Sequence, residues 1–565
     1  MKKFPHYPKR KSLDLNTIWD FKFIDDADFD QFEPAEVKYD DRLPVPSAFD
    51  AFPAYNGKRG IGVYRCFVDI ANNTDALLKI GSAAMYSKVF ADGQQIGEHF
   101  SAYTPFECRI PAAEKLTREI VIMTCNVFDY DKYPLHEIFF DFYAYGGIFR
   151  DVEVQLLPDG ELIEWVGVDT VDFEQRKIKV IVKSHGCQNI EISVNDSFIK
   201  EIKNVDFSQG SYDFELELKE LSLWSPEAPA LHTLTVDNGM DSMTVRFGIR
   251  QVKAEKSKIL LNGIPVKLLG CCRHEAHAQY GPALPIQQLY SDVQLLKDLG
   301  CNFVRGSHYP QDPRFLEICD EMGILVFEES MGWGQQARHF IDDKFIAAQL
   351  KQTSEMIEAS YNNPSVIIRG FLNEGSSECE EAATIYTALA ELIRDEAPNC
   401  LVTYASHRGL NDRYLDLVDV VCFNIYPGWY AQDPNNEKPL DEILPKINEC
   451  IKGLEEMGFV DKPFIISEIG AGAIYGWRDP ICAHWSEDYQ NEYFKIVCNE
   501  VVSNDKINGI SLWQFCDCRT YRGSTALARP RAFNNKGLLD EYRRPKMAYY
   551  SVKNIFQGNT ANGNQ

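Results

Sequence analysis

Two acidic residues, Glu374 and Glu468, stand at the ends of apolar runs that are typical of buried strands. The run "SVIIRGFLNE" (365–374) ends in Asn373 and Glu374, and "PFIISEIG" (463–470) carries Glu468 near its end. Two carboxylates that meet in a wet cleft can divide the work of acid and nucleophile, which is the chemistry of glycoside hydrolysis. A single carboxylate at a strand end is about as often a helix cap or an ion-pair partner, so its neighbours have to decide.

The segment from 249 to 565 alternates apolar runs with helical patterns. Helices are predicted over 285–300 and over 312–323, the second with Asp312 as its N-cap and Gly323 at its end. Eight alternating units predict a closed (β/α)₈ TIM barrel, whose active site lies at the carboxyl ends of the strands. The predicted strands are 264–270, 301–305, 324–329, 365–374, 400–406, 419–426, 463–470 and 507–515.

Further polar and aromatic residues are predicted at the same strand ends, and together they favour a functional site. They are Arg273, His274, Glu275, His308, Tyr309, Glu328, Glu329, Asn424, Tyr426 and Trp513. Among them, Glu275, Glu328 and Glu329 are expected to support the structure rather than to react. The remaining histidines of this region, His277, His339, His407 and His484, are expected at the surface or in packing.

The first 248 residues are predicted to be all β. Residues 1–155 show short alternating runs with no helical period, which indicates a β-sandwich, and Asp92-Gly93 is a strong hairpin signal. Residues 156–248 contain short strands at roughly ten-residue spacing, the pattern of a small immunoglobulin-like sandwich.

The composition narrows the partners. The 565 residues carry a net charge of −25, which argues against nucleic acid or an anionic membrane as a partner. We find no apolar run long enough to span a membrane and no secretory signal, and the 16 cysteines have no zinc-site spacing. We therefore expect a cytoplasmic protein without a metal or cofactor.

The segment "RAFNNKGLLD" (531–540) places Lys536 beside two amides, and Gly537 after it predicts a turn. Taken alone, this lysine is most simply a solvated loop residue. In a protein with this negative charge, however, any anionic ligand needs a local cation, and Lys536 is a candidate.

These motifs resemble glycoside hydrolase family 2 over nearly the whole chain. The matching stretches are "GVYRCFVDI", "FADGQQIGEH", "FGIRQVKAEKSKILLNGIPVKLLGCCRHEAH", "VRGSHYPQDPRFLEICDEMGILVFEE", "NPSVIIRGFLNE" and "FIISEIG", which occur in the order found in the family. The resemblance implies a jelly-roll β-sandwich, an immunoglobulin-like sandwich and a (β/α)₈ barrel. It also implies a retaining mechanism.

The resemblance also implies roles for individual residues. Glu374 matches the acid/base and Glu468 the nucleophile, while Asn373 would bind the sugar 2-hydroxyl. The other matches are His274 and His308 as sugar contacts, Tyr426 as the residue that orients the nucleophile with Asn424 beside it, and Trp513 as the floor of the sugar pocket.

The β-glucuronidase-like members of the family carry Asn-x-Lys where this chain has Asn534-Asn535-Lys536, and that pair grips a sugar carboxylate. Asp141 matches an aspartate that reaches the sugar 4-hydroxyl. The second cation is left open, because Pro530 replaces the usual arginine and is flanked by Arg529 and Arg531.

The expected function is therefore that of a retaining exo-β-glucuronidase acting on a terminal β-D-glucuronic acid, and the resemblance implies a homo-oligomer. A β-galacturonidase is the near alternative, which Arg338 would favour if it reached the 4-hydroxyl. A neutral-sugar β-galactosidase would leave Lys536 without a use. A non-catalytic carbohydrate-binding protein is disfavoured, because it would not need two carboxylates.

Overall fold

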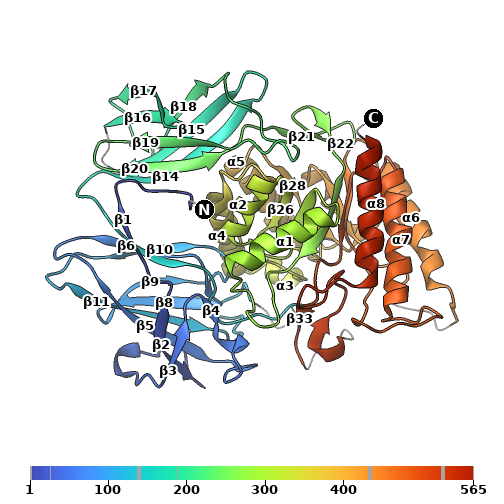
Figure 1. The fold of residues 1–565 in the computed structure, drawn as a ribbon, viewed down its shortest axis with the longest axis horizontal. Helices are drawn as coiled ribbons and strands as arrows, with labels where there is room; N and C mark the ends of the chain where they lie inside the picture. Colours follow the sequence, from blue (N-terminus) through green and yellow to red (C-terminus); the bar gives the residue numbers. More distant parts are fainter. Residues whose placement is uncertain are drawn as a thin grey trace.

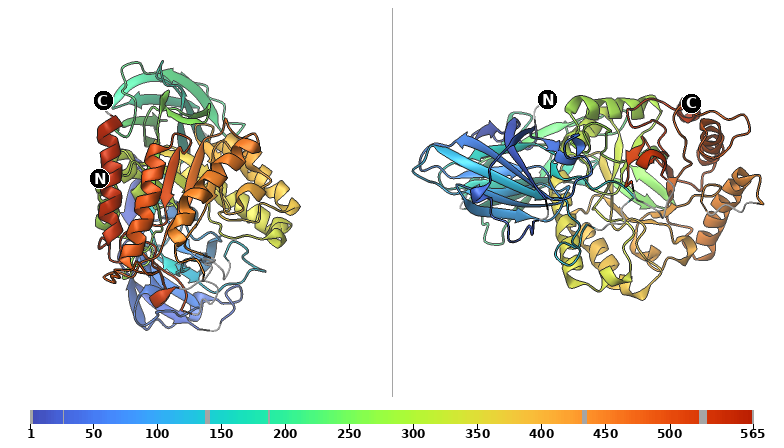
Figure 2. Two further views of the ribbon diagram at one scale, coloured as in Figure 1. Left: turned by 90° about the vertical axis from the view of Figure 1, so that its right-hand side faces the viewer. Right: turned by 90° about the horizontal axis from the view of Figure 1, so that it is seen from below.

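Two β-sandwiches lie side by side against a barrel surrounded by helices (Figure 1). The structure is a computed structural model that describes residues 3–25, 27–136, 141–185, 188–430, 435–522 and 529–563. The two further directions in Figure 2 show the same arrangement, with the first sandwich packed against the barrel. The predicted fold class, a jelly-roll sandwich, an immunoglobulin-like sandwich and a TIM barrel, is confirmed.

The first sandwich consists of a six-stranded sheet in the order β3-β2-β5-β11-β8-β9, a four-stranded sheet in the order β1-β13-β6-β10, and the small sheet β4-β12-β7. A buried apolar cluster that includes Trp19, Tyr64 and Ile122 lies between them. The strands are β1 (Lys11–Asp14), β2 (Ile18–Ile24), β3 (Asp41–Pro44), β4 (Ser47–Ala48), β5 (Ile61–Asp69), β6 (Ala76–Ile80), β7 (Ala83–Ala84), β8 (Tyr86–Ala91), β9 (Gln94–His99), β10 (Phe106–Ile110), β11 (Thr117–Cys125), β12 (Gly147–Ile148) and β13 (Val152–Leu156).

The predicted hairpin at Asp92-Gly93 joins β8 to β9. Both turn residues have positive φ, 48° for Asp92 and 80° for Gly93. A two-residue turn needs this backbone because it follows the right-handed twist of the strands, and aspartate and glycine adopt it at low cost.

The second sandwich packs the sheet β14-β15-β18 on the sheet β17-β16-β19-β20. Its strands alternate buried and exposed residues, as Lys177–His185 shows, and this alternation is why the sequence pattern was readable. The strands are β14 (Leu162–Asp172), β15 (Lys177–His185), β16 (Asn189–Val194), β17 (Ser197–Lys203), β18 (Tyr212–Glu217), β19 (His232–Asp237) and β20 (Ser242–Phe247). The domain limits 1–155, 156–248 and 249–565 stay predictions.

The barrel is a parallel sheet in the order β28-β27-β26-β25-β24-β32-β31-β30-β29. Segments β28 and β29 are the two halves of the predicted fifth strand, interrupted at Tyr404, so eight strands close the barrel. The strands are β24 (Leu268–Arg273), β25 (Phe303–Gly306), β26 (Leu325–Glu329), β27 (Val366–Gly370), β28 (Leu401–Thr403), β29 (Ala405–Ser406), β30 (Val421–Asn424), β31 (Phe464–Ile469) and β32 (Gly509–Leu512). A short sheet of β21 (Val252–Glu255), β22 (Lys258–Leu261) and β23 (Ile264–Pro265) precedes it.

Helices surround the barrel, and the caps predicted for α2 are present. Asp312 accepts a hydrogen bond from the backbone nitrogen of Arg314, and Gly323 ends the helix with φ of 70°. The helices are α1 (Ile286–Asp298), α2 (Pro313–Met322), α3 (Ala337–Phe340), α4 (Asp343–Ser360), α5 (Ala383–Glu396), α6 (Ile443–Glu456), α7 (Glu487–Ser503) and α8 (Met547–Gly563). Within the described residues, no helix combines the length and apolarity needed to cross a membrane.

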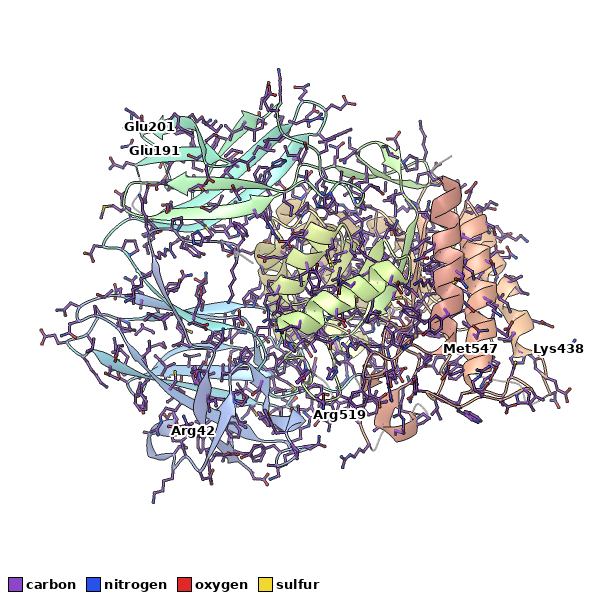
Figure 3. The ribbon with its side chains drawn as sticks, in the orientation of Figure 1. Arg42, Glu191, Glu201, Lys438, Arg519 and Met547 are labelled. Carbon is purple, nitrogen blue, oxygen red and sulfur yellow. The ribbon has the colours of Figure 1, made fainter. Side chains whose placement is uncertain are left out.

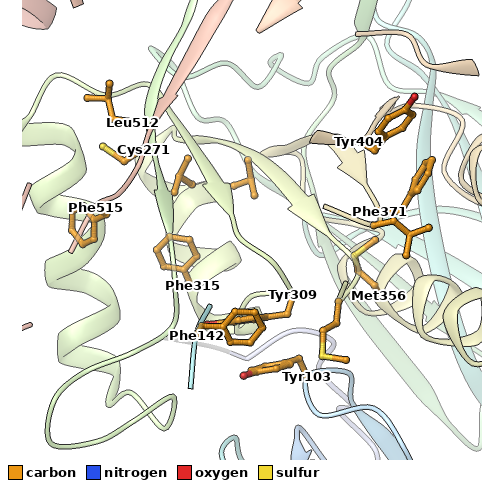
Figure 4. Packing of buried hydrophobic residues seen from close by; sticks show 14 of the residues in the cluster. Tyr103, Phe142, Cys271, Tyr309, Phe315, Met356, Phe371, Tyr404, Leu512 and Phe515 are labelled. Atoms are coloured by element: carbon orange, nitrogen blue, oxygen red, sulfur yellow. The ribbon is translucent and has the colours of Figure 1, made fainter. Parts of the chain in front are cut away.

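The first sandwich contacts the carboxyl ends of the barrel strands directly. Tyr103 stacks on Tyr309 with ring centroids 3.9 Å apart, and Phe142 packs beside them (Figure 4). Arg150 forms a buried ion pair with Glu275 at 3.0 Å. These contacts hold residues 141–150, the segment that begins with Asp141, against the barrel.

Candidate active site

The two predicted carboxylates reach the same end of the barrel from different backbone settings. Glu468 lies inside β31 and is 3% exposed. Glu374 lies four residues beyond β27, in a turn where Leu372 has φ of 43° and Glu374 itself has φ of 55°. Non-glycine residues rarely adopt this conformation, and it persists where the surroundings enforce it. Here the backbone nitrogen of Glu374 donates to the carbonyl of Ala405 in β29.

Glu468 is surrounded by hydrogen-bond donors. Its Oε1 accepts from Nη1 of Arg305 at 2.8 Å, and its Oε2 accepts from the hydroxyl of Tyr426 at 2.6 Å. Burial raises the pKa of Glu468, the Arg305 charge opposes that rise, and the nearby charge of Glu374 adds to it. Two strong donors favour the ionised form of Glu468 over that of its neighbour.

Glu374 has weaker partners. Its Oε1 accepts from Nδ2 of Asn424 at 2.9 Å, and Nδ1 of His407 lies 3.9 Å from its Oε2. Burial raises the pKa of Glu374, and the hydrogen bond from Asn424 and the charge of Arg305 only partly oppose this. Of two neighbouring carboxyls, the one with the weaker donors is the one that keeps a proton. The arrangement can therefore supply an acid at Glu374 and a nucleophile at Glu468.

Arg305 joins Glu468 to Asn373, the residue before Glu374, and the sequence analysis missed it. It is fully buried and donates to Glu468, to Oε1 of Glu329 at 2.7 Å and to Oδ1 of Asn373 at 2.7 Å. A signal was present, since a charged residue inside the apolar run "CNFVRG" has to be buried with a partner. Glu329 takes the supporting position that was expected for it.

Several buried polar atoms at this end lack a hydrogen-bond partner within the described part of the chain. They include Nδ2 of Asn373, Nε2 of His274 and Oδ1 of Asn534. Buried polar groups are nearly always paired, so orphaned atoms gathered beside a carboxylate pair indicate a place for a polar ligand. Asn424 holds Asn373 in position through a 3.1 Å hydrogen bond.

Aromatic rings form one side of the site. Trp513 stacks on His308 with centroids 5.2 Å apart, and His274 meets Trp513 edge to face at 5.4 Å. Phe142 from the first sandwich packs against both histidines, 5.1 Å from His274 and 6.3 Å from His308. Burial lowers the pKa of His308 to about 3 and that of His274 well below its ordinary value, so both rings are neutral at working pH.

Lys536 is fully buried next to this group. Its ammonium lies 4.6, 5.5 and 5.6 Å from the ring centroids of Tyr430, Tyr426 and Trp429, and it donates to the hydroxyl of Tyr430. Burial lowers the pKa of Lys536 well below its ordinary value, and the charge of Arg529 acts in the same direction. Tyr430 was not predicted, although it follows Tyr426 by one helical turn's spacing in "NIYPGWY".

Asp141 reaches the same place from the first sandwich. Its carboxylate accepts from Nε of Arg529 at 3.0 Å and from Nδ2 of Asn534 at 3.0 Å. Arg529 also donates to the hydroxyl of Tyr430 at 3.3 Å, so that hydroxyl accepts from two cations. Asp141, Arg529 and the Asn534–Lys536 segment thus form one cluster beside Glu468.

Three further residues singled out in the sequence have other surroundings. Arg531 is 45% exposed and pairs with Glu541 at 2.8 Å. Arg338 is exposed on α3, with its guanidinium over the ring of Tyr130. His407 was expected at the surface or in packing and is exposed, as expected; its Nδ1 also lies 3.9 Å from Oε2 of Glu374.

The described residues contain no group of three or more His, Cys, Asp or Glu placed to hold a metal ion. The fifteen described cysteines are all free thiols.

A barrel with a carboxylate pair at its strand ends, flanked by two sandwiches, defines a glycoside hydrolase. The chain belongs to glycosyl hydrolases family 2: the model of the family's TIM barrel domain matches residues 252–560, and a second model of the family matches residues 165–250.

Relatives with curated functions cover most of the chain. It is 26% identical to the β-glucuronidase of Streptococcus agalactiae serotype V over 594 residues, which is 96% of each chain. It is 27% identical to the β-glucuronidase of Homo sapiens over 522 residues, 85% of this chain and 78% of that one. A crystal structure of a family 2 β-galacturonidase from Eisenbergiella tayi bound to galacturonate superposes with a TM-score of 0.89, at 32% identity and 99% coverage of both chains.

Proposed function

We propose that this enzyme is a retaining exo-β-glucuronidase that removes a terminal β-D-glucuronic acid from conjugates or oligosaccharides. The observation that carries the proposal is the fully buried Lys536, whose Nζ lies 5.5 Å from the ring centroid of Tyr426, the tyrosine that donates to Glu468. Burying an ammonium is costly, and an anionic group of the substrate at this place would offset that cost. The curated relatives named above are β-glucuronidases.

The proposed reaction has two displacements. Glu374 donates its proton to the glycosidic oxygen while Glu468 attacks the anomeric carbon, so the aglycone leaves as an alcohol and a glycosyl-enzyme forms. Glu374, now ionised, takes a proton from water, and the resulting hydroxide displaces Glu468. Two inversions at the same carbon give net retention.

We match the sugar hydroxyls to polar side chains of the site. Asn373, whose Nδ2 has no described partner, would donate to the 2-hydroxyl, where a hydrogen bond strengthens as charge develops. Asp141 would accept from the 4-hydroxyl. His274 and His308 would contact the sugar as neutral rings, with Trp513 as the floor beneath it, and Tyr426 would keep Glu468 oriented, with Asn424 fixing Asn373 and Glu374.

The substrate carboxylate would lie between Lys536 and the amide of Asn534. Arg529 is the better candidate for the second cation, because it lies across the Tyr430 hydroxyl from Lys536. Arg531 is paired with Glu541 instead. In a chain of net charge −25, such a local group of cations is what a uronate needs.

A second candidate, a β-galacturonidase, is favoured by the 32% identity to the enzyme from Eisenbergiella tayi, which is higher than the identity to the two glucuronidases. A neutral-sugar β-galactosidase is less favoured, because it would bury Lys536 without a use for it. A purely binding protein would need neither carboxylate.

We also propose a homo-oligomer working in the cytoplasm. The family resemblance supports the first point, and the free, mostly buried thiols support the second. Light scattering on the purified protein would give the oligomeric state, and a monomer would contradict the proposal.

The function is tested with 4-nitrophenyl β-glycosides of glucuronic acid, galacturonic acid, glucose and galactose, compared by kcat/KM. The glucuronide is expected to be cleaved fastest, and both uronides faster than both neutral glycosides. Faster cleavage of the galacturonide would select the second candidate. A neutral glycoside cleaved as fast as the uronides would contradict the carboxylate site altogether.

A further inference from the structure

The segment that carries Lys536 is held from behind by a second buried lysine, Lys546. Its ammonium donates to the carbonyl oxygens of Ala473 at 2.7 Å and Asn535 at 3.0 Å, and to Oδ1 of Asp517 at 2.8 Å. Both charged side chains of this pair are 0% exposed. Lys546 therefore ties together the loop after β31, the loop after β32 and the Asn534–Lys536 segment.

The same pair reaches the backbone on both sides of Lys536. Lys546 binds the carbonyl of Asn535, and Oδ1 of Asp517 accepts from the backbone nitrogen of Gly537 at 2.9 Å. The carbonyl of Lys536 itself accepts from the backbone nitrogen of Gln514 at 3.0 Å. Two of the bonds that hold the backbone around Lys536 thus depend on the pair; the others come from the backbone nitrogens of Gln514 and Ala473 and from Nε2 of Gln490.

Gly537 has no room for a side chain. A Cβ at this position would lie 2.3 Å from the backbone nitrogen of Asp517 and 2.3 Å from the carbonyl oxygen of Leu539. The expected turn is present at Asn535-Lys536, and the glycine after it makes a close backbone contact that only glycine permits. The loop that carries Lys536 packs directly on the loop after β32, and Lys546 bonds to both loops.

We propose that Lys546 and Asp517 are positioning residues for uronate recognition: they set the location of the Lys536 ammonium relative to Glu468. This inference rests on the proposed function, since it matters only if Lys536 binds a carboxylate. A buried ion pair is weak evidence for stability, because desolvation offsets most of its attraction. Positioning is where such a pair can have its effect, since a displacement of about 1 Å at a binding group can cost about 100-fold in rate.

The chain offers a matched control in Lys462. Its ammonium donates to three carbonyl oxygens, those of Leu415, Asp416 and Val418, at 2.8, 2.9 and 2.6 Å. It lies just before β31, at the end of the barrel opposite the active site. Lys462→Met and Lys546→Met therefore both remove hydrogen bonds from a lysine to backbone carbonyls, at the two ends of one barrel, and only Lys546→Met also removes a buried ion pair.

The test compares kcat/KM on 4-nitrophenyl β-glucuronide and β-glucoside for the wild type and both variants, with Tm measured in parallel. Lys546→Met is expected to lower glucuronide cleavage at least about tenfold more than glucoside cleavage. Lys462→Met is expected to leave the ratio unchanged, whatever its Tm. An unchanged ratio of glucuronide to glucoside cleavage in Lys546→Met, whether or not both rates fall, would overturn the inference.

A second variant covers the case in which Lys546→Met does not fold. Asp517→Asn keeps an acceptor for Gly537 but removes the charge that holds Lys546. Glucuronide cleavage is again expected to fall more than glucoside cleavage. An unchanged ratio in Asp517→Asn would overturn the inference as well. A failure of the proposed function looks different, because the wild type itself would then show no preference for the glucuronide.

Discussion

The two halves of the site are built differently. The carboxylate pair comes from the barrel strands or from just beyond them, and Arg305 inside β25 holds Glu468 in place. The cluster around Lys536 comes from loops and from the first sandwich, through Asp141. Chemistry common to the family thus lies on rigid strands, whereas the feature that would select a uronate lies on connecting segments, which can change without disturbing the barrel.

Replacing Glu468, the proposed nucleophile, should have the largest effect, and that effect should not depend on the substrate. Glu468→Gln removes the attacking oxygen but keeps the shape, so kcat should fall by at least about 10⁴-fold on glucuronide and glucoside alike. Stopped or continuous release of 4-nitrophenol measures this. Activity near that of the wild type would mean that another residue is the nucleophile.

The pH dependence should report both carboxyls. Glu374 must be protonated, so activity is lost as pH rises through its pKa, and Glu468 must be ionised, so activity is lost as pH falls through its pKa. Because burial raises both pKa values from the ordinary 4.5, the bell-shaped profile of kcat/KM should lie at higher pH than two unperturbed glutamates would give. A profile whose acidic limb lies below pH 4.5 would contradict this.

Arg305→Lys should sharpen the assignment. It keeps the charge but loses the forked contact, and a charged hydrogen bond of this kind is worth about 10–100-fold in kcat/KM. The lysine keeps the charge that lowers the pKa of Glu468 but loses the hydrogen bond that also lowers it, so the acidic limb of the profile should move slightly to higher pH. A rate loss without that movement would show that Arg305 acts only through Asn373 or Glu329.

Tyr430→Phe should have a smaller effect, confined to the loop half. The hydroxyl accepts from both Lys536 and Arg529, and losing a hydrogen bond of about 1 kcal/mol corresponds to about a fivefold loss in kcat/KM on the glucuronide. The glucoside serves as the internal control and should be unaffected. Equal losses on both would place Tyr430 in the chemistry instead.

The smallest effect is expected for Arg338→Ala. Arg338 is exposed on α3 over Tyr130, and surface substitutions change free energies by about 0.5 kcal/mol or less. The ratio of glucuronide to galacturonide cleavage should therefore change by no more than about twofold. A larger shift would show that this arginine contributes to the choice between the epimers.

Local signals explain what could be predicted. Asp312 and Gly323 marked α2, Asp92-Gly93 marked a hairpin, and the eight apolar runs marked the barrel strands, because caps, turns and burial act over a few residues. The carboxylate pair was predicted because Glu374 and Glu468 stand at the ends of two of these runs. These features depend on local sequence or on one general rule of barrel geometry.

What the sequence could not supply depends on contacts between distant segments. The pairing of Asp141 with Arg529 joins residues 388 positions apart, and Lys546 acts through backbone carbonyls that leave no sequence pattern. The close contact at Gly537 is equally invisible, because glycine in a loop usually indicates a turn. Arg305 was the one omission that a closer reading of its strand would have found.

The central claim is that Lys536 binds the carboxylate of the substrate. The most direct test is kcat/KM for 4-nitrophenyl β-glucuronide and β-glucoside, which differ only at C6, in the wild type and in Lys536→Met. We expect the substitution to cost at least about 2 kcal/mol, or about 30-fold, on the glucuronide and almost nothing on the glucoside. An equal loss on both substrates, or no loss on either, would contradict the claim.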